Sequence, residues 1–294
     1  MDAVSEKDSW HLRQGDAITP ELTAMRLLGG GAAYEAYLAF DEVTYGPVVV
    51  KVVRPDQVED EHTLRGLARE VETLARVNHP VVVRGLRHQL DGERPHAVLE
   101  HVEGPRLSSL LRRHGRLQEQ QYLPLAIEVA GALHYFRRVD VVHLDIKPSN
   151  VIMGAPARLI DLSVARSHQR AEGSHRIGTD RYMSPEQADP QTHGFPGHEA
   201  DVWGLGATLF HAVAGYRAYD DGDPDAEQLT ERYPQLVQPP RALPDDVHPA
   251  VVDVLLATLD RNPRRRPLPS ELADALEPVV AGLPAPRLTF KVRR

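Results

Sequence analysis

Three polar residues stand close together in the segment HLDIKPSN, at Asp145, Lys147 and Asn150. A loop carboxylate can accept a proton from an attacking hydroxyl, and a nearby ammonium can offset negative charge on a group in transfer. Two short apolar runs, VIM and RLI, follow, and Asp161 comes directly after them. If these runs pair as an antiparallel hairpin, Asn150 and Asp161 lie at the same open end, where amide and carboxylate oxygens suit Mg²⁺. Ordinary surface turns, the alternative, would not explain why these residues bracket one hairpin.

A lysine interrupts a run of valines at Lys51, in the sequence VVVKVV. An ammonium in a buried strand is costly to desolvate unless it has a partner or a ligand. Glu70 is a candidate partner, because it follows Leu67 by three residues and stands at the edge of an apolar helix face. The alternative is two unrelated charges that reach solvent at the ends of their elements.

A glycine cluster, LGGGAAY at residues 28–34, precedes the valine run. Residues without bulky side chains let backbone amides approach phosphate oxygens, so the cluster could form a phosphate-binding loop. Glycine triplets also form plain turns, and the cluster alone does not separate the two interpretations.

The elements that must position these residues fall into two units. Strand-like runs from residue 27 to 53 are followed by a helical period over residues 61–77, whereas most of the chain after residue 104 has a helical pattern. Helices are expected at residues 107–113, 122–136 (with Pro124 in the first turn), 200–214, 251–259 and 270–280. We expect a flexible arm at residues 1–21, a hairpin after Asn150, and a solvated acidic loop from Asp220 to Glu231.

Composition excludes several classes of protein. The 294 residues carry a net charge of −8, which disfavours nucleic-acid binding through bulk positive charge. Without cysteine the chain forms no disulfide, thiolate metal site or cysteine nucleophile, and this is compatible with a reducing cytoplasm. No apolar run approaches the roughly 20 residues of a membrane-spanning helix. The first residues do not have the pattern of a signal peptide, so we expect a cytoplasmic protein.

In combination, these motifs resemble a eukaryotic-like serine/threonine protein kinase of bacterial type over about residues 22–280. Residues 28–37 resemble its glycine-rich loop, Val48–Lys51 its lysine strand, HLDIKPSN its catalytic loop and Asp161–Ser163 its DFG metal site. Gly178, Thr179 and the YMSPE segment at 182–186 resemble the substrate-docking loop, and Arg266 resembles the arginine that pairs with the Glu186 position.

The resemblance implies an α+β, bilobal protein kinase-like fold: a small antiparallel β-sheet lobe with helix C, and a larger, mainly α-helical lobe. The implied boundaries are an N-terminal extension at 1–21, a kinase domain at 22–280 and a C-terminal basic tail at 281–294. Within the domain they are an N-lobe at 22–99, a hinge at 100–104 and a C-lobe at 105–280.

The resemblance also implies the functional residues. The catalytic residues would be Asp145, Lys147 and Thr179, and Asn150 and Asp161 would hold Mg²⁺ or Mn²⁺. Lys51 would bind the phosphates of ATP and pair with Glu70. The remaining ATP-binding residues would be Leu28, Gly29, Gly30, Gly31, Ala36, Val49, the gatekeeper Leu99, Glu100, Val102 and Ile152.

Three departures from the family pattern keep alternatives open. Tyr34 stands at the third glycine of the loop, Leu144 replaces the arginine of HRD, and Leu162 and Ser163 replace Phe and Gly of DFG. Without the arginine, we expect activity that does not depend on activation-loop phosphorylation. A nucleotide-binding pseudokinase scaffold and a small-molecule phosphotransferase remain as alternatives. The expected partners are proteins with Ser or Thr acceptors. The sequence is compatible with a homodimer, and no nucleic acid partner is expected.

Overall fold

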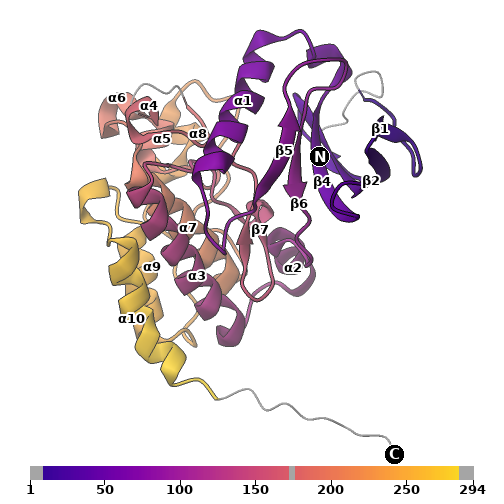
Figure 1. Ribbon diagram of the computed structural model, residues 1–294. Coiled ribbons are helices and arrows are strands. Elements are labelled where there is room, and N and C mark those ends of the chain that lie inside the picture. The colour runs from indigo at the N-terminus through magenta and orange to yellow at the C-terminus, as the bar shows by residue number, and fades with distance from the viewer. Residues whose placement is uncertain (1–8, 172–175, 285–294) are drawn as a thin grey trace, which may run out of the picture.

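The computed structural model describes residues 9–171 and 176–284, and they form two lobes (Figure 1). The smaller lobe is built on a six-stranded antiparallel sheet in the order β1-β2-β3-β4-β6-β5. Its strands are β1 (Ala17–Thr19), β2 (Leu22–Gly30), β3 (Tyr34–Asp41), β4 (Gly46–Val53), β5 (Gly85–Gln89) and β6 (His96–Glu100).

Strand β4 and helix α1 (Glu61–Arg76) carry the predicted lysine and glutamate. In β4, Val48, Val50 and Val52 are buried on one face of the sheet, so Lys51 points to the other face. Helix α1 begins where Asp60 accepts a hydrogen bond from the backbone N–H of Thr63. The predicted strand and helix are both confirmed.

The larger lobe is helical around α7 (His198–Ala214), which is apolar on nearly its whole circumference and almost entirely buried. Helix α7 packs against α3 (Glu119–Arg138) and α9 (Pro249–Thr258), and α10 (Pro269–Ala281) packs on both α3 and α9. The other helices are α2 (Leu107–His114), α4 (His168–Ala171), α5 (Pro185–Ala188), α6 (Pro190–His193) and α8 (Leu229–Arg232). A two-stranded sheet, β7 (Val151–Ile152) with β8 (Arg158–Leu159), completes the lobe.

The placement of Pro124 in a first helical turn is wrong. Helix α3 begins at Glu119, so Pro124 lies in the helix interior. The helix begins earlier than expected because Gln118 and Gln121 form reciprocal side-chain to backbone hydrogen bonds at its N-terminus, a capping box without the usual Ser or Thr.

The flexible arm expected at residues 1–21 is also wrong for residues 9–21. Strand β1 pairs with β2, and Trp10 lies against the sheet, where its Nε1 donates to the carbonyl of Val53 at 2.7 Å. The guanidinium of Arg94 stacks on the Trp10 ring at 4.7 Å. Residues 1–8 and most of the predicted basic tail, 285–294, lie outside the described residues.

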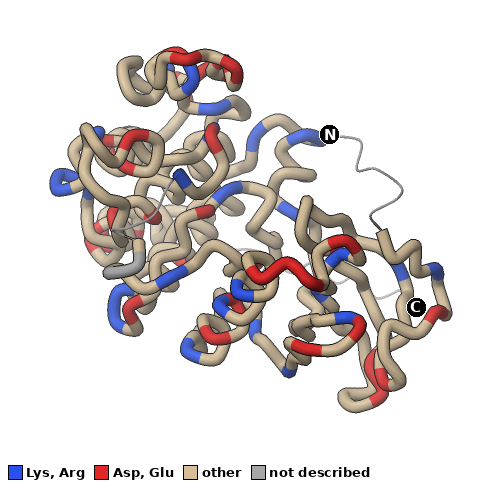
Figure 2. Tube along the Cα trace, turned by 90° about the horizontal axis from the view of Figure 1, so that it is seen from above, with Lys and Arg blue, Asp and Glu red and all other residues tan. Residues whose placement is uncertain are grey.

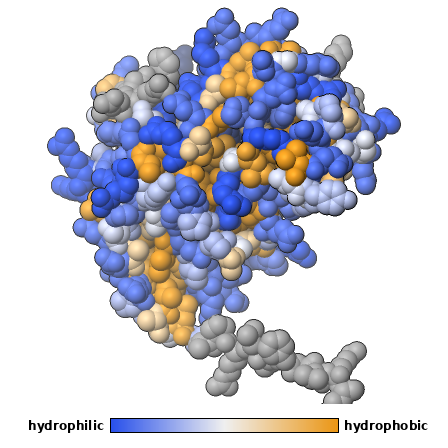
Figure 3. Space-filling view, viewed as in Figure 1, coloured by the Kyte–Doolittle hydropathy of each residue, from blue (hydrophilic) through white to orange (hydrophobic). Residues whose placement is uncertain are grey.

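The surface has no broad region of a single chemical character in the views shown. Seen from above, basic and acidic positions intersperse over both lobes (Figure 2). The face in Figure 3 is mainly hydrophilic, with apolar side chains in narrow stripes. Among the described residues, no helix is long and apolar enough to cross a membrane.

Candidate functional site

The predicted hairpin forms and brings its two flanking residues together. Val151 pairs with Leu159 and Ile152 with Arg158 in an antiparallel register, and the backbone N–H of Ile160 donates to the carbonyl of Asn150 at 2.9 Å. Asn150 therefore directly precedes β7, and Asp161 follows β8 by two residues, at the same end of the hairpin. Both residues line the same cavity.

That cavity has a volume of about 680 Å³ and lies between the sheet of the small lobe and the β7–β8 hairpin. Its walls include every residue predicted to bind nucleotide: Leu28, Gly29, Gly30, Gly31, Ala36, Val49, Lys51, Glu70, Leu99, Glu100, Val102 and Ile152. The side chain of Glu100 binds Arg84 and Arg158, and its backbone N–H donates to the carbonyl of Arg84 at 3.0 Å.

Lys51 joins the two lobes inside this cavity. Its Nζ lies 2.6 Å from Oε2 of Glu70 and 3.0 Å from Oδ1 of Asp161. Burial alone would lower the pKa of Lys51, but the charges of Glu70 and Asp161 outweigh it and raise the pKa above its usual value. Lys51 is therefore a fixed cation, and the prediction that it has a partner is confirmed.

The chemistry of these side chains fits a hard divalent cation. Two carboxylates and one ammonium leave one negative charge in excess, and the side chain of Asp161 remains 39% exposed. Burial opposes ionisation of Asp161, but the charge of Lys51 and hydrogen bonding from Ser163 hold its pKa well below its usual range. Asn150 uses Nδ2 to donate to the carbonyl of Asp145 at 2.9 Å, so its amide oxygen is the atom left for a cation.

Asp145 contacts a side chain that lines this cavity and two side chains that line a second one. Its Oδ2 accepts from Nδ2 of Asn150 at 3.1 Å, on the side of the first cavity. On the other side, its Oδ1 accepts from Thr179 Oγ1 at 2.7 Å, and its Oδ2 lies 2.7 Å from Nζ of Lys147. Lys147 also donates to Thr179 at 2.6 Å. Because Asn150 lines the first cavity and Lys147 and Thr179 line the second, the carboxylate of Asp145 contacts residues from both.

Helix α7 fixes the backbone of the loop that carries Asp145. The buried carboxylate of Asp201 accepts from the backbone N–H groups of His143 at 2.7 Å and Leu144 at 2.8 Å. Burial raises the pKa of Asp201 to about 7, although the two N–H groups act in the opposite direction. Leu144 adopts φ = +64°, a conformation that L-residues rarely take, so the loop has to be held from outside.

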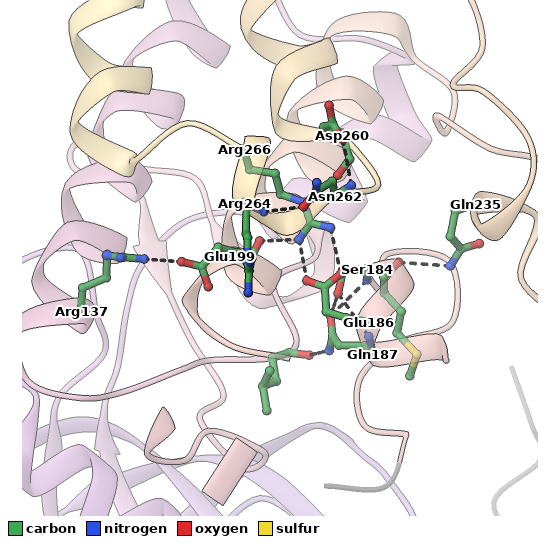
Figure 4. A network of polar contacts seen from close by, with 12 residues as sticks. Arg137, Ser184, Glu186, Gln187, Glu199, Gln235, Asp260, Asn262, Arg264 and Arg266 are labelled. Carbon is green, nitrogen blue, oxygen red and sulfur yellow. Dashed lines mark hydrogen bonds and ion pairs between the residues drawn. The ribbon is translucent and has the colours of Figure 1, made fainter. Parts of the chain in front are cut away.

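A buried ion pair anchors the segment that follows Thr179. Arg266 binds Glu186 through two nitrogens, at 2.5 and 2.8 Å, and donates to the carbonyl of Glu199 (Figure 4). Both side chains of the pair are buried. Removing one partner of such a pair typically costs about 3–5 kcal/mol. The pairing predicted between these two positions is confirmed.

Gln187 is a positioning residue that the sequence did not reveal. Its Nε2 donates to the carbonyls of Leu144 and Ile177, both at 2.8 Å, and thus joins the loop of Asp145 to the segment before Thr179. The two segments approach so closely that a Cβ atom on Gly178, where φ is +123°, would lie 2.7 Å from the carbonyl oxygen of Leu144.

The glycine-rich turn between β2 and β3 is held on two sides. On the inner side, the hydroxyl of Tyr34 donates to the carbonyl of Thr63 in α1 at 2.7 Å, and its ring lies 4.8 Å from Nζ of Lys51. On the outer side, Arg54 donates from Nε to the carbonyl of Gly31 at 2.6 Å. Tyr34 therefore ties the turn to the helix that carries the partner of Lys51.

The N-terminal segment is linked to the glycine-rich turn by a buried ion pair between Glu35 and Arg54. The carboxylate of Glu35 pairs with Arg54 at 3.1 Å, and it accepts from the hydroxyl of Tyr37 at 2.8 Å and from the backbone N–H of Trp10 at 3.2 Å. Glu35 and Arg54 are both buried. Nothing in the spacing of Trp10 or Glu35 marks these contacts, which form only once the sheet brings the residues together.

We expect Trp10→Ala to weaken ATP binding without changing the chemical step. Loss of the bond to Val53 loosens the segment that orients Glu35 and Arg54, and the KM for ATP should rise by about fivefold, comparable to one hydrogen bond between neutral groups. The value of kcat should stay unchanged, and Trp10→Phe should give an intermediate KM. Tyr45→Ala, at an exposed position of the same lobe, is the control. An unaltered KM in Trp10→Ala would show that the segment does not position the turn.

Comparison with known proteins agrees with this geometry. The family profile described as the protein kinase domain matches residues 22–275. Serine/threonine-protein kinase PknA of Mycobacterium tuberculosis strain H37Rv is 30% identical over 291 residues, covering 94% of this chain and 65% of that protein.

Two further relatives are similar at slightly lower identity. PkaB of Streptomyces coelicolor is 29% identical over 275 residues, covering 89% of this chain and 64% of that protein. PknB of Mycolicibacterium smegmatis is 28% identical over 251 residues, covering 82% of this chain and 40% of that protein. The chain thus spans about two thirds of the first two relatives and less of the third. With the family profile matching most of its length, this chain belongs to the protein kinase family, alongside relatives of bacterial origin.

Proposed function

We propose that this chain is an ATP-dependent serine/threonine protein kinase, which transfers the γ-phosphoryl group of Mg·ATP to protein hydroxyls. The observation that carries the proposal is that the carboxylate of Asp145 contacts Asn150, from the cavity with Lys51 and Asp161, as well as Lys147 and Thr179, from the other cavity. Membership of the kinase family and the names of its relatives support the same function.

Each side chain then has a defined role. Lys51, held by Glu70, orients the α and β phosphates, and Asn150 and Asp161 hold Mg²⁺ or Mn²⁺, which neutralises phosphate charge when bound. Asp145 orients the acceptor hydroxyl and accepts its proton, while Lys147 offsets charge on the transferred group. The hydroxyl of Thr179 fixes the rotamer of Asp145.

A radiolabelled ATP assay tests the proposal. The protein is incubated with Mg·ATP and with dephosphorylated casein or histone as acceptor, and the Asp145→Asn variant serves as the inactive control. We expect label on serine or threonine in the wild-type reaction only. Nucleotide binding without any transfer would favour a pseudokinase scaffold. Transfer to sugar or antibiotic acceptors but not to proteins would favour a small-molecule phosphotransferase.

The remaining parts of the proposal concern partners and location. Protein substrates are supported by the anchored segment around Thr179 and Glu186, which has the form expected for docking a polypeptide. The net charge of −8 disfavours nucleic acid. A cytoplasmic location stays a prediction, and so does a homodimer. Sedimentation of the purified protein would show whether the homodimer forms.

We also propose that activity does not require phosphorylation of the segment between Asp161 and Glu186. Leu144, at the position of the missing arginine, lies in an apolar cluster with Val164, Ala171 and Ile177 from that segment. Gln187 adds two neutral hydrogen bonds between the same parts of the chain. The described contacts of the Leu144 side chain are apolar, so this position offers no guanidinium to a phosphate. Arg166, in the same segment, uses Nε to donate to the carbonyl of Val164 at 3.3 Å.

Phosphatase treatment tests this independence. Protein that has been incubated with a broad-specificity phosphatase, then freed of it, should phosphorylate casein at a rate within about twofold of the untreated protein. Release of phosphate from previously labelled casein confirms that the treatment works. Loss of turnover after the treatment would contradict the proposal.

A further inference from the structure

The second cavity, of about 440 Å³, adjoins the position of the acceptor hydroxyl. Its walls come from helix α2, the loop of Asp145, residues 179–182 and the C-terminal end of α7. Lys147 and Thr179 form one wall, and both contact the carboxylate of Asp145. A group that fills the cavity therefore lies next to the hydroxyl that reacts.

The charged residues that line this cavity are all basic. They are Arg112, Lys147, Arg181 and Arg217. Arg181 and Arg217 share a single carboxylate, that of Asp221, at 2.9 and 2.7 Å, and each uses only one nitrogen for it. Positive charge therefore exceeds negative charge at this pair, and N–H donors remain to bind an anion.

Arg112 adds a further positive charge from α2. Its one contact within the described part of the chain is a long hydrogen bond, 3.4 Å, to the hydroxyl of Ser109. The side chains of Arg181 and Arg217 are 56% and 28% exposed, so an incoming chain can reach them. A guanidinium with unused donors is the preferred partner of a carboxylate or a phosphoryl group.

The neighbouring acids do not cancel this charge. Asp180 lies 3.6 Å from a nitrogen of Arg232, and Asp220 lies 3.8 Å from one of Arg241, so each has its own cation. His211, which also lines the cavity, is neutral: burial and the charge of Arg217 lower its pKa to about 4. Its Nδ1 lies 2.8 Å from the hydroxyl of Tyr182.

We infer that this cavity binds an anionic side chain of the protein substrate, a carboxylate or a phosphoryl group close in sequence to the acceptor Ser or Thr. The inference rests on the proposed kinase function and adds a substrate class to it. Basic side chains at the same place would meet Arg112, Arg181 and Arg217 and be repelled.

A peptide series tests the inference. Peptides that share one serine acceptor carry Glu, phosphoserine, Gln or Lys at each flanking position in turn, and kcat/KM is measured with Mg·ATP. At one position or more, the Glu peptide should exceed the Gln peptide by about tenfold, the effect of one charged hydrogen bond, and the Lys peptide should be the poorest. A gain with phosphoserine but not with Glu would identify a phosphoryl group as the ligand.

The Arg112→Gln/Arg217→Gln double variant supplies the second measurement. The ratio of kcat/KM for the Glu peptide to kcat/KM for the Gln peptide should fall to within about twofold. Arg65→Gln, an exposed arginine of α1, is the control. Equal rates for the Glu, phosphoserine and Gln peptides in the wild-type protein would overturn the inference and leave the kinase function standing. An undiminished preference in the double variant would overturn it too, whereas absence of transfer to any peptide or protein would refute the kinase function itself.

Discussion

Replacing Asp145 by Asn will reduce phosphoryl transfer by about a thousandfold while nucleotide affinity stays within about twofold of wild type. The amide cannot accept the proton of the acceptor hydroxyl, and it meets donors on three sides, from Lys147, Asn150 and Thr179. Lys51 and Asp161, the residues proposed to bind the nucleotide and its metal, are held by contacts with Glu70 and with each other that do not involve Asp145. Single-turnover rates and calorimetry with Mg·ATP measure the two effects separately.

The matched control is Asp253→Asn, the same substitution at an exposed position of α9. It should retain full activity. Thermal unfolding of both variants checks that each is folded. A tenfold or smaller loss in Asp145→Asn would mean that this carboxylate is not the proton acceptor, and a parallel loss of ATP binding would mean that its role is structural.

Local motifs indicated Lys51, Glu70, Asn150 and Asp161, and the resemblance to the kinase family that these motifs carry supplied the other residues that line the first cavity. A lysine in a buried strand and a glutamate at the edge of an apolar helix face each require a partner, and the hydrophobic periods predict the strand and the helix that carry them. The hairpin between Asn150 and Asp161 is likewise a local structure of two short strands. In these cases the residues that carry the chemistry lie on the elements whose pattern is clearest.

The sequence did not reveal contacts that depend on the packing of distant segments. Trp10 reaches Val53 and Glu35 because β1 pairs at the edge of the sheet, and no periodic pattern marks so short a strand. Gln187 bridges Leu144 and Ile177 only because α5, the loop of Asp145 and the segment before Thr179 pack together. An isolated glutamine or tryptophan carries no signal of its partner, since the partner is chosen by the tertiary fold.

The prediction of a flexible arm at residues 1–21 was wrong for residues 9–21 for the same reason. Absence of period in residues 1–21 indicates that no long amphipathic element forms, but it does not exclude a segment held by a few specific contacts. Here one aromatic ring, one buried carboxylate and three ladder residues hold it. Polar contacts between distant residues can order a segment that lacks any apolar pattern.

Asp161→Asn will abolish the metal dependence of nucleotide binding, which Asp145→Asn leaves intact. The substitution keeps size and shape, and Asn tolerates the left-handed conformation of this residue, φ = +68°, so the variant should fold. It removes the charge that suits a divalent cation and leaves Lys51 paired with Glu70 alone.

Calorimetry of ATP binding with and without Mg²⁺ measures this effect directly. In the wild-type protein Mg²⁺ should strengthen ATP binding, and in Asp161→Asn the two affinities should agree within about twofold. Transfer should fall by about a thousandfold, since a bound metal supplies several kcal/mol of transition-state stabilisation. Asp253→Asn again provides the control. Because Asp145→Asn loses transfer but keeps the effect of Mg²⁺, the pair of variants separates proton acceptance from metal binding. A full Mg²⁺ effect in Asp161→Asn would place the cation elsewhere.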